Sequence, residues 1–180
     1  MINIAGVEIP NRVDELTVEQ FDKLNSINLN KSDSLDKWIE KFVYLGVPEE
    51  AFDSMTLDEF KSKVSEFNDI PEAPQERVFT FDVDGFTYET NESISLKDLS
   101  LIEKVWKVDR SEFSAECLAV LFKRADLTRN EHYTASHIKH KKALFKSLKC
   151  QIAIPHIIAV SELLVKSAER INDESTKDVE

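Results

Sequence analysis

Two aspartates, Asp82 and Asp84, stand two residues apart directly after the apolar run of residues 78–81 (VFTF). A carboxylate at a strand end can attack a phosphoryl group, while a second carboxylate serves as general acid and base and magnesium lies between them. Gly85 follows at once, and Asp-Gly between alternating apolar runs is also a strong signal for a two-residue hairpin turn. The segment is therefore either a phosphoryl-transfer site or the tip of a β-hairpin.

The sequence around Asp82 and Asp84 resembles the first motif of phosphatases of the haloacid dehalogenase type. That family usually has a threonine after the glycine, where this chain has Phe86. It also needs a parallel sheet of repeated strand–helix units, whereas the chain after Tyr88 has the apolar spacing of helices. We therefore favour the hairpin, with Asp84 and Gly85 at its turn.

Histidines at positions 137 and 140 lie on a segment with helical periodicity, with His132 and Cys150 nearby in the sequence. A zinc site needs three or four converging ligands, and the lysines around these histidines oppose a divalent cation. The chain has no glycine-rich phosphate loop, Gly-x-Ser-x-Gly elbow or His-Glu-x-x-His helix. We expect no catalytic residue, no metal, no cofactor and no enzymatic activity.

The basic segment of residues 137–149 contains five lysines, and its one aromatic residue, Phe145, falls on the apolar stripe. Three interpretations remain open: a solvated helix face, a docking surface for an acidic helix of this chain or a partner, and a nucleic-acid contact. The segment has no arginine for bidentate contacts, which argues against nucleic acid. The candidate partner-binding residues in this segment are Lys139, Lys142, Lys146 and Lys149.

The net charge of the 180-residue chain is −11, and it is unevenly distributed. Residues 1–76 carry 17 acids and 7 bases, whereas residues 132–170 carry 7 bases and 2 acids. An acidic body repels nucleic acid at long range, so we do not expect a nucleic-acid partner.

Two cysteines in apolar helical patterns predict buried, reduced thiols, and the N-terminus predicts no signal peptide. No segment predicts a membrane span, so we expect a cytoplasmic protein.

The first half of the chain predicts a small helical subdomain, residues 1–68, that opens with a short strand or hairpin around Gly6. Thr17 with Gln20, and Thr56 with Glu59, are capping-box patterns that predict helix starts. Two prolines and three acids in residues 69–76 (DIPEAPQE) predict a linker.

The second half, residues 77–171, predicts a β-hairpin followed by a helical bundle. Serines mark two helix starts: Ser95, and then Ser111 or Ser114. The last helix is expected from about Pro155 to Ile171, because proline is favoured in a first turn. Residues 172–180 are expected to be an acidic flexible tail. The predicted fold class is thus α+β, mainly α.

Several segments resemble tail-assembly chaperones of tailed bacteriophages in the order of their elements. The likeness spans most of residues 2–170, and it is carried by residues 14–24 (DELTVEQFDKL), 35–46 (LDKWIEKFVYLG), 81–88 (FDVDGFTY), 96–99 (LKDL) and 117–124 (CLAVLFKR). The lysine-rich segment and the long final helix depart from that pattern.

The resemblance implies a non-enzymatic factor that binds a long, aggregation-prone helical client, the tape-measure protein, in the host cytoplasm. The departures leave open an alternative role as a structural ring or connector component of the virion, which implies a homo-oligomer. Six apolar helix residues are candidates for the client surface, and plain core is the competing interpretation. They are Val105, Trp106, Ile157, Ile158, Leu163 and Leu164.

Overall fold

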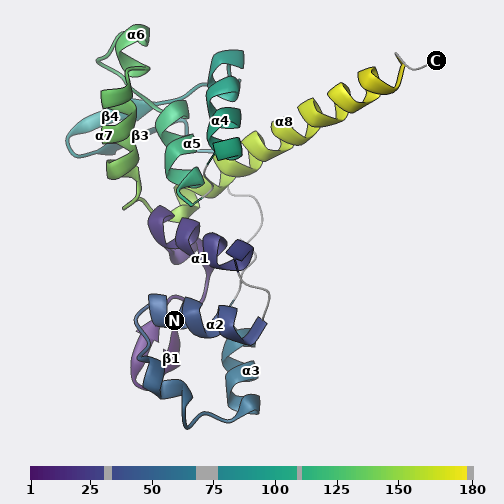
Figure 1. Cartoon of the computed structure of the whole chain (residues 1–180). Helices are drawn as coiled ribbons and strands as arrows, with labels where there is room; N and C mark the ends of the chain where they lie inside the picture. Colours follow the sequence, from purple (N-terminus) through teal and green to yellow (C-terminus); the bar gives the residue numbers. More distant parts are fainter. Residues whose placement is uncertain (31–33, 68–76, 109–110, 178–180) are drawn as a thin grey trace.

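The computed structural model describes residues 1–30, 34–67, 77–108 and 111–177. Over these residues the fold is α+β and mainly helical, which confirms the predicted class. A β-hairpin and short helices lie on one side of helix α1 (Val18–Asn30), and a small sheet with further helices lies on the other (Figure 1). The predicted linker, residues 69–76, lies outside the described residues.

The N-terminal hairpin pairs β1 (Ile2–Ile4) with β2 (Val7–Ile9) in antiparallel register. Its turn has positive φ angles at Ala5 (51°) and Gly6 (85°), as the tight turns that match strand twist require. Alternation along the strands sends one row of side chains inward, namely the buried Ile2, Ile4 and Ile9.

Helix α2 (Ser34–Tyr44), the 3-10 turn η2 (Glu49–Phe52) and helix α3 (Leu57–Glu66) pack beside this hairpin around one aromatic side chain. Phe42 is fully buried, and its ring centroid lies 5.7 to 6.4 Å from those of Trp38, Phe52, Phe60 and Phe67. The predicted capping box at Thr56 and Glu59 is present at the start of α3.

Helix α1 follows the short 3-10 turn η1 (Val13–Glu15) and packs against helices of both halves of the chain. The capping pattern of Thr17 and Gln20 is also present, with each residue bonded to the other's backbone amide. At the start of α1, backbone amides and carbonyls of residues 16–19 pair with those of residues 146–150, and we call this contact the N–C junction. Its bonds join Val18 N to Leu148 O (2.8 Å), Glu19 N to Lys146 O (3.0 Å) and Cys150 N to Leu16 O (2.9 Å). The predicted subdomains 1–68 and 77–171 are thus tied together by main-chain hydrogen bonds.

The second half opens with β3 (Thr80–Val83) and β4 (Phe86–Glu89), a hairpin in which Phe81 lies opposite Tyr88. Asp84 and Gly85 have φ angles of 51° and 75°, so the two-residue turn predicted for them is confirmed. A third strand, β5 (Lys123–Arg124), extends the sheet beside β4. The sequence did not predict β5, because two basic residues show no alternation.

The remaining helices are α4 (Leu96–Val108), α5 (Phe113–Leu121), α6 (Arg129–His132), α7 (Ala135–Phe145) and α8 (Cys150–Lys177). Helix α5 is the centre of this half: eight of its nine residues are buried, and it contacts α1, α4, α7 and α8. The exception is the half-buried Glu116.

Helix α8 is longer than predicted at both ends and leads away from the body toward the C-terminus (Figure 1). The expectation that it starts near Pro155 was wrong, because Pro155 lies inside the helix. Proline removes the bond to the carbonyl four residues earlier, that of Gln151, which is an exposed residue that water can reach. The expected tail from residue 172 is helical through Lys177.

His156 on α8 ties this helix to the start of the sheet. Its Nε2 lies 2.9 Å from the Val78 carbonyl oxygen, and its Nδ1 lies 3.4 Å from Arg77 Nε, so Nε2 donates and Nδ1 accepts. Burial lowers the pKa of His156 to about 4, so the ring is neutral at physiological pH.

Across residues 1–30, 34–67, 77–108 and 111–177, no helix has both the length and the apolar character to cross a bilayer.

The central position of α5 gives a stability prediction. Leu118 is fully buried in α5, so Leu118→Ala should lower the free energy of unfolding by about 2–5 kcal/mol through lost burial and a residual cavity. Urea denaturation followed by circular dichroism measures the change. Leu96→Ala, at a residue that is 86% exposed on α4, is the matched control and should change it by less than about 0.5 kcal/mol. Equal effects of the two variants would contradict this core assignment.

Candidate protein-binding groove

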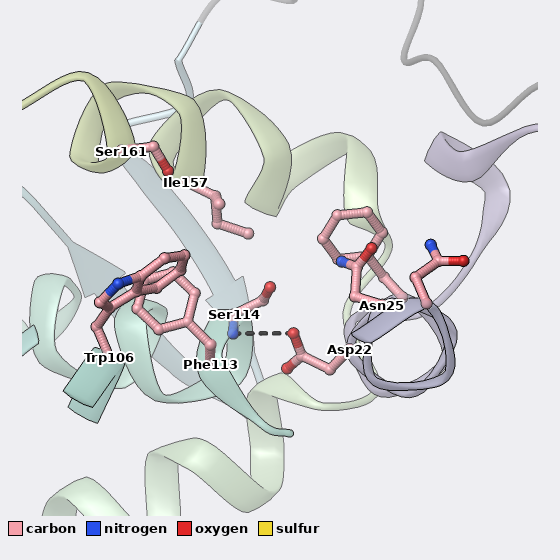
Figure 2. A pocket seen from close by; sticks show the side chains of 9 residues that line it. Asp22, Asn25, Trp106, Phe113, Ser114, Ile157 and Ser161 are labelled. Atoms are coloured by element: carbon pink, nitrogen blue, oxygen red, sulfur yellow. Dashed lines mark hydrogen bonds between the residues drawn. The ribbon is translucent and has the colours of Figure 1, made fainter. Parts of the chain in front are cut away.

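A groove of about 260 Å³ lies where α1, α4, α5 and α8 meet, and Figure 2 shows its walls. Helices α4 and α5 supply aromatic side chains on one side, α1 supplies a carboxylate and amides on the other, and α8 closes the top of the view. The lining residues are Phe21, Asp22, Asn25, Asn28, Trp106, Phe113, Ser114, Ile157 and Ser161.

The apolar wall centres on Trp106, which the sequence singled out as a candidate. Its ring meets that of Phe113 edge-on, with centroids 4.8 Å apart, and its side chain is still 38% exposed. Ile157 of α8 points into the same space (Figure 2). An exposed tryptophan beside an aliphatic side chain in a concave site is typical of surfaces that bind another protein.

The polar side of the groove is formed by Asp22, which is only 4% exposed. Its Oδ1 accepts the amide N–H of Ser114 at 3.0 Å, and its Oδ2 accepts that of Ala115 at 3.1 Å. These amides belong to the first turn of α5, where backbone donors have no partner within the helix. Burial raises the pKa of the Asp22 carboxyl to about 6, although the hydrogen bonds from the first turn of α5 act in the opposite direction.

The prediction that Ser111 or Ser114 caps this helix was wrong. Glu112 occupies the N-cap position without a side-chain cap bond, and Asp22 of α1 supplies the acceptors instead. The sequence carried a signal for this role, because Asp22 lies four residues after the buried Val18 on the inward face of α1.

The other end of α5 is bound by a buried lysine. Lys141 of α7 is 2% exposed, and its Nζ donates to the Phe122 carbonyl at 3.0 Å and to His132 Nδ1 at 2.7 Å. His132 Nε2 in turn lies 2.9 Å from the Val120 carbonyl. Burial lowers the pKa of Lys141 to about 7, and burial with the neighbouring Lys141 lowers that of His132 to about 4. Sequence reasoning missed Lys141, although it lies three residues after Ile138 and four before Phe145 on the inward face.

The predicted basic residues have different environments. Lys142 binds Glu112 at 2.8 Å and Glu116 at 3.4 Å, and Lys146 binds Glu112 and, at 3.6 Å, Glu19. These ion pairs join α7 to the acidic start of α5. Part of the basic segment therefore docks on an acidic helix of the same chain.

Lys149 donates from Nζ to the Glu15 carbonyl at 2.8 Å, next to the N–C junction. The exposed Lys139 lines a second groove, of about 560 Å³ between α5 and α7, together with Lys142 and Lys146. Glu112 and Glu116 lie in the same groove, so carboxylates are interspersed among these three lysines, and Lys149 lies outside it.

Leu163, another of the apolar candidates, lies on α8 with 37% of its surface exposed and does not line the groove. Ile158 and Val165 on the same helix are 41% and 56% exposed. The structure therefore brings Trp106 together with Ile157 and leaves Leu163 on an exposed part of α8.

The aspartates singled out first lie on the hairpin tip, away from this groove. Thr87 Oγ1 donates to Asp82 Oδ1 at 2.6 Å, and Asp84 occupies the turn of an antiparallel pair, so the parallel sheet of the phosphatase family is not the context here. Within the described part of the chain, no group of three or more histidine, cysteine, aspartate or glutamate side chains is placed to hold a metal ion.

The raised pKa of Asp22 gives a pH prediction. Between about pH 4 and 6 the folded state holds a proton that the unfolded carboxyl, with a pKa near 3.8, has released, so this group lowers stability as pH rises. Relative to Asp22→Asn, the wild-type free energy of unfolding should fall by roughly 1 kcal/mol per pH unit across that window. Urea denaturation at several pH values measures the difference. Asp82→Asn, at an exposed carboxyl, is the control; a slope of the same size there would contradict the prediction.

The lowered pKa of Lys141 has the opposite slope. Above about pH 7 the unfolded state, with a pKa near 10.5, binds the proton that the folded state has lost, so stability rises with pH. From pH 7 to 8.5 the wild type should gain roughly 1 kcal/mol per pH unit over Lys141→Met. The same denaturation series with Lys139→Met, at an exposed lysine of α7, should show no such gain. If the difference in free energy of unfolding between the wild type and Lys141→Met does not change with pH, Lys141 stays charged in the folded state and the prediction is wrong.

Comparisons of this chain with protein-family models, with curated proteins and with solved structures found no match.

Proposed function

We propose that this chain is a non-enzymatic protein-binding factor, a tail-assembly chaperone of a tailed bacteriophage that binds the long helical tape-measure protein. The groove beside Trp106 is the observation that carries the proposal. It offers concave apolar surface between helices, which is the kind of site in which an amphipathic helix places its apolar side chains.

The surface next to the groove supports the same proposal. Ile158 and Val165 expose much of their apolar area on α8, the helix that also supplies Ile157 to the groove. A client helix seated in the groove has further apolar area to cover along α8. The net charge of −11 favours solubility of a complex with an aggregation-prone client.

A structural ring or connector component is the second candidate, and the shape of α8 favours it. This helix leads away from the body (Figure 1), and exposed apolar side chains on an extended helix also suit contacts between copies of one chain. A ring component forms a large homo-oligomer without a client, whereas a chaperone forms a soluble complex with one.

A co-expression experiment tests the proposal. The tagged chain is produced together with the tape-measure protein encoded by the same genome, and the soluble tape-measure fraction is measured after centrifugation. Trp106→Ala should reduce this fraction severalfold, because the loss of an aromatic anchor costs about 2 kcal/mol or more. Leu96→Ala removes a more exposed apolar residue from the same helix and should leave the fraction unchanged.

Light scattering on the purified chain separates the two candidates. A small particle that combines with the tape-measure protein in a defined ratio supports the chaperone. A large homo-oligomer that leaves the tape-measure protein insoluble would sink it and favour the ring component. Circular dichroism of Trp106→Ala shows whether any loss of binding reflects unfolding.

A further inference from the structure

Among the described residues that line the groove, Asp22 has the only charged side chain. The other polar groups of the lining are the amides of Asn25 and Asn28 and the hydroxyls of Ser114 and Ser161. Glu112, whose charge also raises the pKa of Asp22, is bound by Lys142 and Lys146, which do not line this groove. A positive group that enters the groove therefore meets the Asp22 carboxylate without a basic side chain among the described lining residues.

The carboxylate of Asp22 has unused capacity to accept hydrogen bonds. Each oxygen accepts one backbone amide from α5, and the Ser114 side chain provides a further hydrogen bond that lowers the pKa of Asp22, while an ionised carboxylate offers about four acceptor positions. Taking a carboxylate out of water costs free energy that these hydrogen bonds offset only in part, and burial accordingly raises its pKa. A cation that binds Asp22 offsets more of that cost.

The apolar walls fit the stem of a long basic side chain. Trp106 and Ile157 face Asp22 and Asn25 across the groove (Figure 2). An arginine packs its methylenes on apolar surface and places its guanidinium at a polar end, where an aromatic face adds cation–π attraction. Its five N–H donors match a carboxylate surrounded by amide and hydroxyl oxygens.

We propose that the client helix is anchored by one arginine, whose guanidinium binds the Asp22 carboxylate while its stem lies between Trp106 and Ile157. This inference rests on the proposed function, because it names the side chain that a client presents to the groove. A client that presents a leucine or phenylalanine there leaves the Asp22 carboxylate covered by apolar groups without a countercharge, which is costly.

Two small probes of equal shape test the anchor on the full chain. 1-Butylguanidinium carries the arginine head group and stem, and 1-butylurea is its uncharged counterpart. Titrations followed by ¹⁵N NMR report on the Ser114 and Ala115 amides and the Trp106 indole. Butylguanidinium should bind about tenfold more tightly than butylurea, since a charge-assisted hydrogen bond to a carboxylate adds about 1.4 kcal/mol or more.

Asp22→Asn should abolish the preference for butylguanidinium, and Asp82→Asn, which removes the same charge from an exposed site, should retain it.

Equal binding of the two probes to the wild type would overturn the arginine anchor while leaving an apolar groove for the proposed function. An equal loss in both variants would also overturn it, because net charge and not Asp22 would then set the preference. If neither probe shifts these resonances, the anchor is wrong, and the tape-measure solubility assay still decides the proposed function separately. The wild-type comparison of probes stands even if Asp22→Asn unfolds.

Discussion

The C-terminal half of this protein depends on how the two ends of one buried helix are bound. Helix α5 places nearly all its side chains in the interior, so its terminal amides and carbonyls cannot rely on water. Asp22 from α1 accepts the amides at the first turn, and Lys141 from α7, together with His132, binds carbonyls at the last. When ionised, Asp22 lies at the positive end of the helix dipole and Lys141 at the negative end, which offsets part of the cost of burying each charge. Each contact also fixes the position of a neighbouring helix, α1 at the first turn and α7 at the last, and the groove lies where α1, α4 and α8 meet α5.

Asp22 therefore has two roles, since its carboxylate caps α5 and its side chain also lines the groove. A ligand that changes the charge state of this carboxyl changes the stability of the α5 terminus by linkage. A ligand that binds at Asp22 would therefore be coupled to folding through this one group, with no need for a conformational change between distant sites.

Much of the fold was predictable because it follows from local pattern. The hairpin turn at Asp84 and Gly85 and the capping boxes at Thr17 and Thr56 depend on residues within a few positions of each other. The groove was predictable only in part: Trp106 and Ile157 were singled out as apolar candidates, but Asp22 of α1 was not, and only tertiary packing brings the three together. Sequence reasoning treated lysines as surface groups, so it missed Lys141, whose inward position at helical spacing was the available signal. The cap that Asp22 provides for α5 was missed for a different reason, because a capping residue is normally sought within the few residues that precede a helix.

The N–C junction bears on how the protein is made. Lys149 reaches the Glu15 carbonyl, and Cys150 Sγ reaches that of Thr17, across 134 and 133 residues of chain. A ribosome delivers the N-terminal end first, so Leu16, Val18 and Glu19 lack their main-chain partners until the segment before α8 has left the exit tunnel. Contacts so distant in sequence also slow folding, because a long loop must close before they form. The N-terminal segment therefore keeps these backbone groups without their partners until residues 146–150 emerge, and their emergence is the step that closes this contact.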